Sequence, residues 1–285
     1  MRRLWVVALS ITMLLLPALS GGCSSEPVVA LPGIHPDQDQ AVAGLQRLWD
    51  AKLKFTPSGR HQVVSEVDLG TTQVTDAGLM HLRDLTTIER LTLNGTSIGD
   101  RGIEHLTGLK SLRVLNLLDT QITDRGMAQL RGLTNLEELN LSYTHIGNAG
   151  LAYLKELTQL QYLDLRNTKI SDGGLEHLAP LVNLQELNLS ATQVTDAGLA
   201  HLRPLRVLNR LQLGYTAVTD KGLMHLKHLG QLQYLSVRAT AVTDAGLQHL
   251  KTLPRLRNLV VSRTRVTEEG IANLQKPLPS VTIYR

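Results

Sequence analysis

The sequence predicts an α/β solenoid: nine 24-residue repeats with a cap at each end and parallel strands on the concave face. Three observations predict it. A threonine recurs at every 24th position from Thr72 to Thr264, an aliphatic residue follows two positions later, and a glycine follows four positions after that. The nine units follow one another without an insertion. Aromatic residues make up only 3% of the chain, which favours many small aliphatic layers over one bulky core.

Within each repeat, the spacing of the leucines changes from that of a strand to that of a helix. Leu91 and Leu93 lie on one face of an extended segment, because side chains alternate along a strand. Asp100 then begins a short helix, which we expect its carboxylate to cap. We expect the recurring threonines to pair with backbone groups of adjacent coils. The helical glycine costs about 1 kcal/mol relative to alanine, so its recurrence predicts close approach of neighbouring coils.

The chain is expected to divide into four segments. These are a signal peptide (1–22), a flexible tether (23–38), an N-terminal cap (39–62) and the solenoid (63–285). Arg2 and Arg3 precede an apolar run that is too short and too broken for a membrane span. Val42, Leu45 and Trp49 have helical spacing, as an N-terminal cap requires. Residues 281–283 are expected to form a final strand that arrives two residues early, in a shortened coil.

The only cysteine, Cys23, follows two glycines at the end of the apolar run. Small residues before a lone cysteine resemble a bacterial lipobox, in which the cysteine is lipidated and becomes the new N-terminus. Ser20 stands where the lipobox prefers leucine. The alternatives are ordinary cleavage after Ser20, which leaves Cys23 as a free thiol, and an uncleaved anchor. We expect an exported protein of the cell envelope, attached to the membrane through Cys23 if that residue is modified.

The repeat pattern L-x-x-L-x-L-x-x-T-x-[VI]-[TG]-D-x-G-L-x-x-L resembles the leucine-rich-repeat family over residues 63–285. The T-D-x-G-L element is similar to repeats of the ribonuclease-inhibitor-like, F-box-associated branch and of exported bacterial repeat proteins. Threonine occupies the turn position where many members carry asparagine. The resemblance implies a leucine-rich-repeat solenoid that binds a partner. No F-box-like helical segment precedes the repeats, which argues against a role as a ubiquitin-ligase adaptor.

Three columns of strand residues are expected to face solvent on the concave side, and they vary between repeats while the core positions do not. The second column includes Asp164, Asn188 and Ser236. Tyrosine and arginine dominate binding hot spots. We therefore predict that a protein partner contacts the concave residues Tyr143, Tyr162, Arg166, Arg210, Tyr215, Tyr234 and Arg238. All but Arg210 form two clusters, Tyr143 with Tyr162 and Arg166, and Tyr215 with Tyr234 and Arg238. The clusters are separated by three repeats and either hold a repetitive ligand or were copied by duplication of a three-repeat block.

Other functions receive less support from the sequence. Without Arg2 and Arg3 the chain has 27 basic and 25 acidic residues, so no nucleic-acid partner is expected. A histidine column suggests metal ligands, but Gln129 and Tyr153 fill the same position, so we expect a structural role and no metal site. The column consists of His81, His105, His177, His201, His225 and His249.

Motifs for phosphate binding, metalloprotease activity or a nucleophile elbow are missing from the sequence, so we expect no enzyme and no cofactor. The sequence thus favours a protein-binding scaffold at the cell envelope. The alternative is a structural envelope protein that self-associates through the repeats, and an enzyme comes third.

Overall fold

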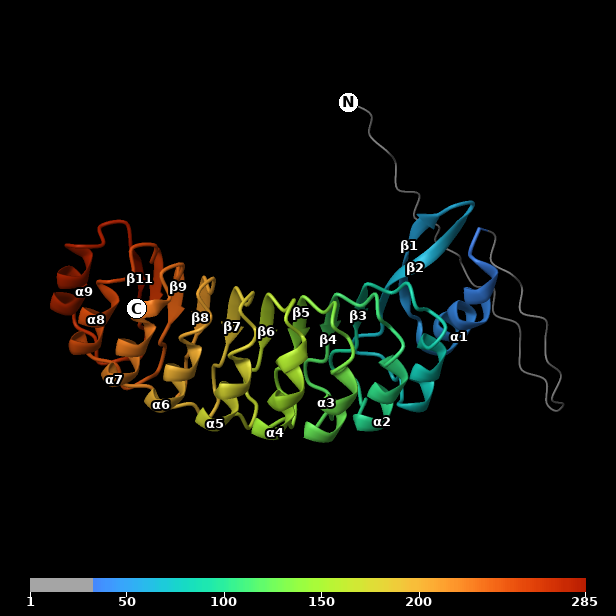
Figure 1. Cartoon of the computed structure of the whole chain (residues 1–285), viewed down its shortest axis with the longest axis horizontal. Helices are drawn as coiled ribbons and strands as arrows, with labels where there is room; N and C mark the ends of the chain where they lie inside the picture. The colour runs from blue at the N-terminus through green and yellow to red at the C-terminus, as the bar shows by residue number, and fades with distance from the viewer. Residues whose placement is uncertain (1–32) are drawn as a thin grey trace, which may run out of the picture.

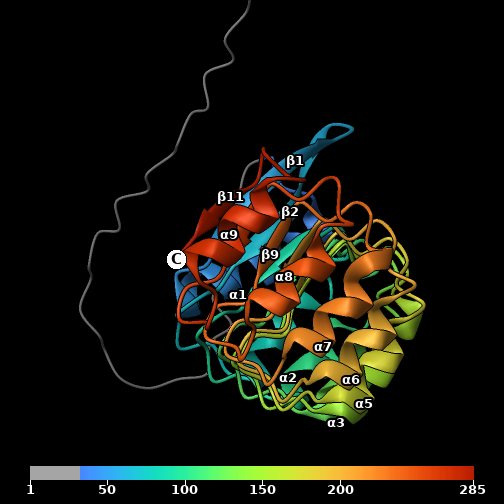
Figure 2. The same cartoon turned by 90° about the vertical axis from the view of Figure 1, so that its left-hand side faces the viewer.

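The computed structural model describes residues 33–285, which form one continuous curved solenoid (Figures 1 and 2). Strands line its concave side and short helices its convex side (Figure 1). The strands are β1 (Lys52–Ser58), β2 (His61–Asp68), β3 (Arg90–Thr92), β4 (Val114–Asn116), β5 (Glu138–Asn140), β6 (Tyr162–Asp164), β7 (Glu186–Asn188), β8 (Arg210–Gln212), β9 (Tyr234–Ser236), β10 (Asn258–Val260) and β11 (Thr282–Tyr284).

The helices lie on the opposite side of each coil. The α-helices are α1 (Asp39–Trp49), α2 (Asp100–Ile103), α3 (Asp124–Leu130), α4 (Asn148–Leu151), α5 (Asp172–Leu175), α6 (Asp196–Leu199), α7 (Asp220–Leu223), α8 (Asp244–Leu250) and α9 (Glu268–Gln275). Short 3₁₀ helices are η1 (Pro36–Gln38), η2 (Ala77–Leu82), η3 (Glu104–Leu106), η4 (Ala152–Glu156), η5 (Glu176–Leu178), η6 (Ala200–Leu202) and η7 (Met224–His228).

The strands of residues 33–285 form one 11-stranded sheet in chain order, parallel throughout except for β1, which pairs antiparallel with β2. The register is constant, since Leu139 lies opposite Leu163 and each later pair also joins equivalent positions of consecutive repeats. The predicted α/β leucine-rich-repeat solenoid is therefore confirmed. The expected shortening of the last coil is wrong, because Ile283 of β11 lies opposite Leu259 in the same register as the earlier pairs.

The N-terminal end holds a helix and a hairpin. Helix α1 buries Val42 and Leu45 completely against the first coil. The Trp49 ring occupies the space that a side chain at Gly78 would need. The helical spacing identified α1, but it gave no sign of the hairpin β1–β2, which extends the sheet and projects from the end of the solenoid (Figure 1).

The core is a column of thin aliphatic layers. In one layer, Leu139, Leu141, Ile146, Leu151 and Leu154 are all 0% exposed. Burying each such side chain stabilises the fold by about 1.5–3 kcal/mol. Because each coil contacts only its neighbours, the core grows by one layer with each repeat and needs no large central side chain.

In the repeats, the aspartate at the start of the helix, or Asn148 in one repeat, binds the next coil and does not cap its own helix, so the capping expectation is wrong. Asp196 Oδ1 accepts a hydrogen bond from the Thr219 backbone N–H at 2.7 Å, and Oδ2 accepts one from the Thr219 hydroxyl at 2.6 Å. The Thr219 hydroxyl oxygen in turn accepts from the Lys221 N–H and caps α7. The carboxylate reaches forward because the facing position in the next repeat offers both a backbone and a side-chain donor.

The recurring glycine makes room for this carboxylate. A Cβ on Gly222 would lie 2.5 Å from Asp196 Oδ1, and one on Gly126 would lie 2.5 Å from Asp100 Oδ1. Neither distance is tolerated between real atoms. The predicted close approach of neighbouring coils is thus confirmed, and the contacting atoms belong to the aspartate of the preceding repeat. We call this arrangement the aspartate–glycine interlock.

The recurring threonines bond within their own coils, which corrects the expectation of bonds to adjacent coils. The Thr144 hydroxyl donates to the Leu141 carbonyl at 2.6 Å, and the Thr216 hydroxyl donates to the Leu213 carbonyl at 2.6 Å. Each bond closes a tight turn at the end of the strand. The residue before the threonine takes a left-handed backbone conformation, and this turn shapes the rim of the concave face.

Candidate functional site

Two of the predicted tyrosines stand on that rim. Tyr143 and Tyr215 both have φ of +59° and are 39% and 48% exposed. A non-glycine residue in this conformation costs about 1–2 kcal/mol. Their backbone N–H groups donate to the carbonyls of Arg166 and Arg238 in the next coil, each at 2.8 Å. The turn therefore fixes each ring beside one particular arginine.

The same two arginines lie against these rings. The Arg166 guanidinium carbon is 5.3 Å from the centroid of the Tyr143 ring, and the Arg238 carbon is 5.6 Å from that of Tyr215. A guanidinium over an exposed ring is stabilised by about 0.5–1 kcal/mol. The structure thus brings together Tyr143 with Arg166 and Tyr215 with Arg238, as expected for the two clusters.

The remaining tyrosines, Tyr162 on β6 and Tyr234 on β9, have different surroundings. The Arg210 guanidinium carbon lies 4.2 Å from the centroid of the Tyr234 ring. The Arg210 Nε also lies 3.4 Å from Glu186 Oε2. Arg210 was predicted on this face but was not paired with Tyr234, although the two residues face each other on adjacent strands.

Tyr162 lies among carboxylates. Its hydroxyl donates to Asp164 Oδ2 at 3.3 Å, and Glu138 and Glu186 occupy the facing positions of the neighbouring strands. Burial, followed by the negative charges of Asp164, Glu186 and Glu138, raises the pKa of Tyr162 to about 12. The phenol therefore stays protonated and serves as a hydrogen-bond donor.

The second column of strand residues does not face solvent throughout, which corrects the expectation. Asp164, Asn188 and Ser236 are at most 9% exposed. Asp164 Oδ1 accepts from the Arg166 N–H at 2.8 Å, and the Asn188 amide donates to Asp164 Oδ2 at 3.1 Å. These side chains form the floor of the concave face and position the rim, so they leave less of the surface free for a partner.

A hollow of about 200 Å³ lies between Arg166 and Arg238 on the concave face. Its walls include Arg166, Arg238, Tyr215 and Tyr234, and its floor includes Gly214. The sequence predicted the four large residues as partner contacts. It could not identify the hollow, because an empty space depends on the small residues between the large ones.

A second hollow, of about 380 Å³, lies where the hairpin meets the first coils. Lys54 and Arg90 line it, but their charges are matched locally. Lys54 Nζ lies 2.8 Å from Glu66 Oε1, and an Arg90 Nη lies 3.8 Å from Glu138 Oε1. Neither this region nor the hairpin was predicted, although Lys52 and Lys54 alternate with apolar residues as in a strand.

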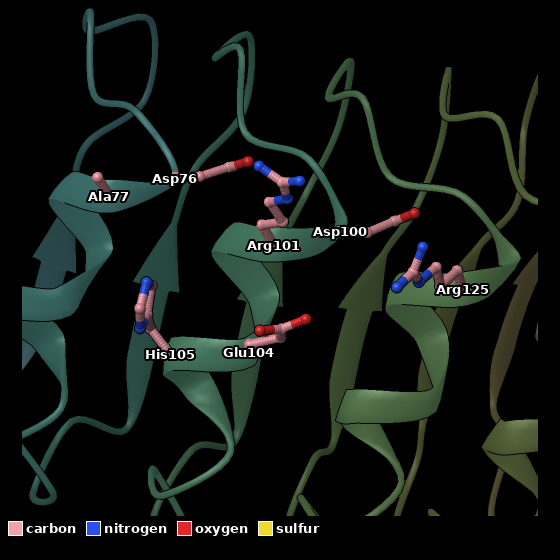
Figure 3. A pocket seen from close by; sticks show the side chains of 7 residues that line it. All are labelled: Asp76, Ala77, Asp100, Arg101, Glu104, His105 and Arg125. Carbon is pink, nitrogen blue, oxygen red and sulfur yellow. The ribbon is translucent and has the colours of Figure 1, made fainter.

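A third hollow, of about 660 Å³, lies on the helical side (Figure 3). Asp76, Arg101, His105 and Arg125 line it and come from three successive coils. Asp76 is already engaged, since its Oδ1 accepts from the Gly99 N–H at 2.7 Å. Burial, and then the positive charge of Arg83, lowers the pKa of His105. Its neutral ring belongs to the histidine column, and no group of three or more metal-ligating side chains occurs within residues 33–285.

Cys23 and the predicted signal peptide lie outside the described residues. In the described part of the chain, none of the helices combines the length and the hydrophobicity needed to span a bilayer.

Comparisons with known proteins agree with this architecture. The sequence matches the family described as leucine-rich repeats (2 copies) at residues 134–179 and 158–201, and a single leucine-rich repeat at residues 108–130. Among curated proteins, none matches the chain.

Similar solved structures include internalin C2 from Listeria monocytogenes, with 24% identity and a TM-score of 0.56 over 87% of this chain and 92% of that one. A leucine-rich-repeat protein of Leptospira interrogans has 22% identity and a TM-score of 0.58 over 78% of this chain and 60% of that one. The plant peptide hormone receptor RGFR1, in complex with RGF2, has 16% identity and a TM-score of 0.55 over 81% of this chain and 36% of that one.

Proposed function

The chain carries leucine-rich repeats folded into one solenoid, and from this premise we propose that its concave face binds a protein partner. The observation that carries the proposal is the pair of Tyr–Arg contacts on the rim, Tyr143 with Arg166 and Tyr215 with Arg238. A strained turn holds each ring in an exposed position, where a monomer gains little from it. Rigid, exposed tyrosine and arginine side chains are the usual anchors of a protein interface. Structures of this fold also include receptors in complex with peptides, as with RGFR1.

The test is an affinity capture from cell-envelope extract with the full chain and with a variant in which Tyr143, Arg166, Tyr215 and Arg238 are replaced by alanine. The wild type is expected to retain a protein that the variant loses. A matched variant carries alanine at Tyr153, Arg101, Arg125 and Arg203 on the helical side, and it should retain that protein. Circular dichroism of both variants checks that the repeats remain folded. Capture of the same protein by all three chains would remove the concave face from consideration.

We further propose that the chain is exported and held at the cell envelope through a lipid on Cys23. The basic pair, apolar run and small residues before Cys23 support this. Metabolic labelling with a radioactive fatty acid should label the full chain and not the Cys23→Ala variant. Ser24→Ala serves as the control and should remain labelled. A Cys23→Ala chain that stays labelled and membrane-bound would contradict the proposal.

Self-association as a structural envelope protein is the second candidate, and the ends of the sheet favour it. In the described sheet, β1 and β11 each have a neighbouring strand on one side only. Unpaired strand edges are templates for pairing with another chain. Sedimentation velocity over a wide concentration range would show concentration-dependent assembly without any added partner if this alternative holds.

A further inference from the structure

Four successive coils carry a distinctive sequence at one position of the concave face. This position, the last of the three concave columns, holds Arg166, Ser190, Gly214 and Arg238 in turn. Two long cationic side chains therefore enclose two small residues, and the space above the small residues is the hollow of about 200 Å³. A larger residue is also disfavoured at Gly214, since a Cβ there would lie 3.3 Å from the Arg238 carbonyl oxygen.

The two enclosing arginines differ from the others on this face in having no carboxylate partner. Arg90 lies near Glu138 and Arg210 near Glu186. Within residues 33–285, no carboxylate oxygen lies within 4.0 Å of the Arg166 or Arg238 guanidinium. Each instead rests on a tyrosine ring, which restrains the side chain but leaves the N–H groups at the edge of the guanidinium free. A guanidinium held in this way is prepared for a bidentate bond to a carboxylate.

The distance between the arginines selects the shape of the ligand. They are three strand intervals apart, and strands are spaced by ~4.8 Å, so the two positions are ~14 Å apart. An extended polypeptide rises by ~3.3 Å per residue, and residues i, i+2 and i+4 point to the same side. Two carboxylates at positions i and i+4 are thus separated by ~13 Å on one face of an extended segment, close to the spacing of the arginines.

We propose that this hollow binds an extended acidic peptide segment of the partner, with carboxylates at i and i+4 on Arg166 and Arg238. The residue at i+2 points into the hollow over Ser190 and Gly214, where only a small side chain fits. Gln212, on the floor, offers an amide to the peptide backbone. This inference rests on the proposed function, because it assigns a chemistry to the partner of the same face.

The test uses a fluorescein-labelled nine-residue peptide of glycine, serine and threonine with aspartate at its third and seventh positions. Its affinity for the full chain is measured by fluorescence anisotropy at low ionic strength. Arg166→Gln and Arg238→Gln are each expected to weaken binding about tenfold or more. The double variant Arg101→Gln/Arg125→Gln removes two charges from the helical side and should bind as the wild type does. Moving the second aspartate to the fifth position should also weaken binding about tenfold, and added salt should weaken it further.

A second variant tests the hollow separately from the charges. Ser190→Leu fills the space between the arginines and leaves both guanidinium groups in place, so it is expected to abolish binding of the same peptide. Retained affinity in Ser190→Leu, or equal affinity for both aspartate spacings, would overturn the proposal.

Binding of the captured protein, of polygalacturonate and of the peptide distinguishes failure of this inference from failure of the proposed function. A captured partner that binds Arg166→Gln and Arg238→Gln chains as it binds wild type would overturn the acidic-segment proposal and leave protein binding in place. Stronger, arginine-dependent binding of polygalacturonate than of the peptide would assign the hollow to an acidic polysaccharide instead. Peptide binding with the expected spacing and no captured protein would support the hollow's chemistry while counting against the proposed source of the ligand.

Discussion

The concave face around Tyr162 and the face around Tyr234 share one backbone frame and have opposite electrostatics. The two tyrosines are three repeats apart, and each is followed at the same interval by an arginine, Arg166 or Arg238. Around Tyr162 the neighbouring strands and the floor supply Glu138, Glu186 and Asp164, and burial together with these charges raises its pKa to about 12. Around Tyr234 the equivalent positions hold Arg210, Asn258 and Ser236, and Arg210 stacks on the ring.

This difference shows that a repeated sequence predicts a repeated backbone but not the same chemical surroundings for each repeated side chain. The backbone and the tyrosine and arginine side chains recur, which suggests two equal clusters for a repetitive ligand. The three facing residues have changed, so one ring is a neutral hydrogen-bond donor among carboxylates and the other supports a cation. A ligand group that suits the Tyr162 ring therefore does not suit the Tyr234 ring. The two regions therefore present different surfaces to a partner.

The largest expected effect tests whether the cores beneath the Tyr162 and Tyr234 regions contribute equally to stability. Leu163→Ala and Leu235→Ala each remove a fully buried side chain at equivalent positions, and each should lower the free energy of unfolding by about 3 kcal/mol. Urea unfolding followed by circular dichroism measures both. Val182→Ala, at a half-exposed position, is the control and should change little. A difference of more than about 1 kcal/mol between the two leucine variants would show that the two cores contribute unequally to stability.

The next effect probes the aspartate–glycine interlock beneath each region. Asp172→Ala and Asp220→Ala each leave the threonine N–H and hydroxyl of the next coil without an acceptor. Each should lower the free energy of unfolding by about 2 kcal/mol. Asp84→Ala, at an exposed position, provides the comparison in the same urea assay. Loss of less than about 0.5 kcal/mol in both variants would mean that these carboxylates do not link the coils.

A third effect belongs to the Tyr162 region alone. The pKa of Tyr162 is higher in the folded chain, about 12, than its ordinary value of 10.0. Its contribution to stability is therefore fully present below pH 10 and is lost as pH rises through about 12. Once solvent screening of the half-buried ring is taken into account, the loss is on the order of 1 kcal/mol.

Urea midpoints of wild type and Tyr162→Phe, measured from below pH 10 to pH 12, should diverge, with the wild type losing more stability. Glu138→Gln should reduce the divergence, because Glu138 contributes to the raised pKa. Parallel curves for wild type and Tyr162→Phe would indicate that the hydroxyl is not shielded by its neighbours.

The smallest effect belongs to the Tyr234 region. Arg210→Ala removes the guanidinium from the Tyr234 ring and should lower the free energy of unfolding by about 0.5 kcal/mol. Arg203→Ala, on the helical side, should have a smaller effect. Thermal unfolding at low and at high salt separates the contribution of the Tyr234 ring from that of the Arg210–Glu186 ion pair, since only the ion pair weakens strongly with salt. An Arg210→Ala variant as stable as wild type would leave Arg210 free for a partner.

The sequence predicted the repeat fold because a strict period fixes it: each coil can bury its leucines only against an identical neighbour. It also predicted the close approach at the glycine, since nine uses of an unfavourable residue require a steric reason. The direction of the aspartate could not be predicted in this way. Asp196 can reach a donor in its own helix or in the next coil, and only the three-dimensional spacing decides between them.

The candidate site was predictable in part for the same reason. Corresponding segments of consecutive repeats lie side by side, which brought Tyr143 to Arg166 and Tyr215 to Arg238. The burial of Asp164 and Asn188 was not predictable, because alternation places both on the open side of the sheet and only the hydrogen bonds to the rim cover them. The hairpin was missed because one short alternating segment resembles many loops.

The aspartate–glycine interlock also limits how the gene can change in length. At each junction from Asp76 with Gly102 to Asp244 with Gly270, a carboxylate, or the Asn148 amide in one case, faces a glycine of the next repeat, so inserting or deleting whole repeats leaves each new junction with both halves. An insertion out of phase would place the carboxylate against a side chain. Mutations that alter length are therefore accepted in steps of one repeat, while substitutions on the concave strands remain free to change the partner.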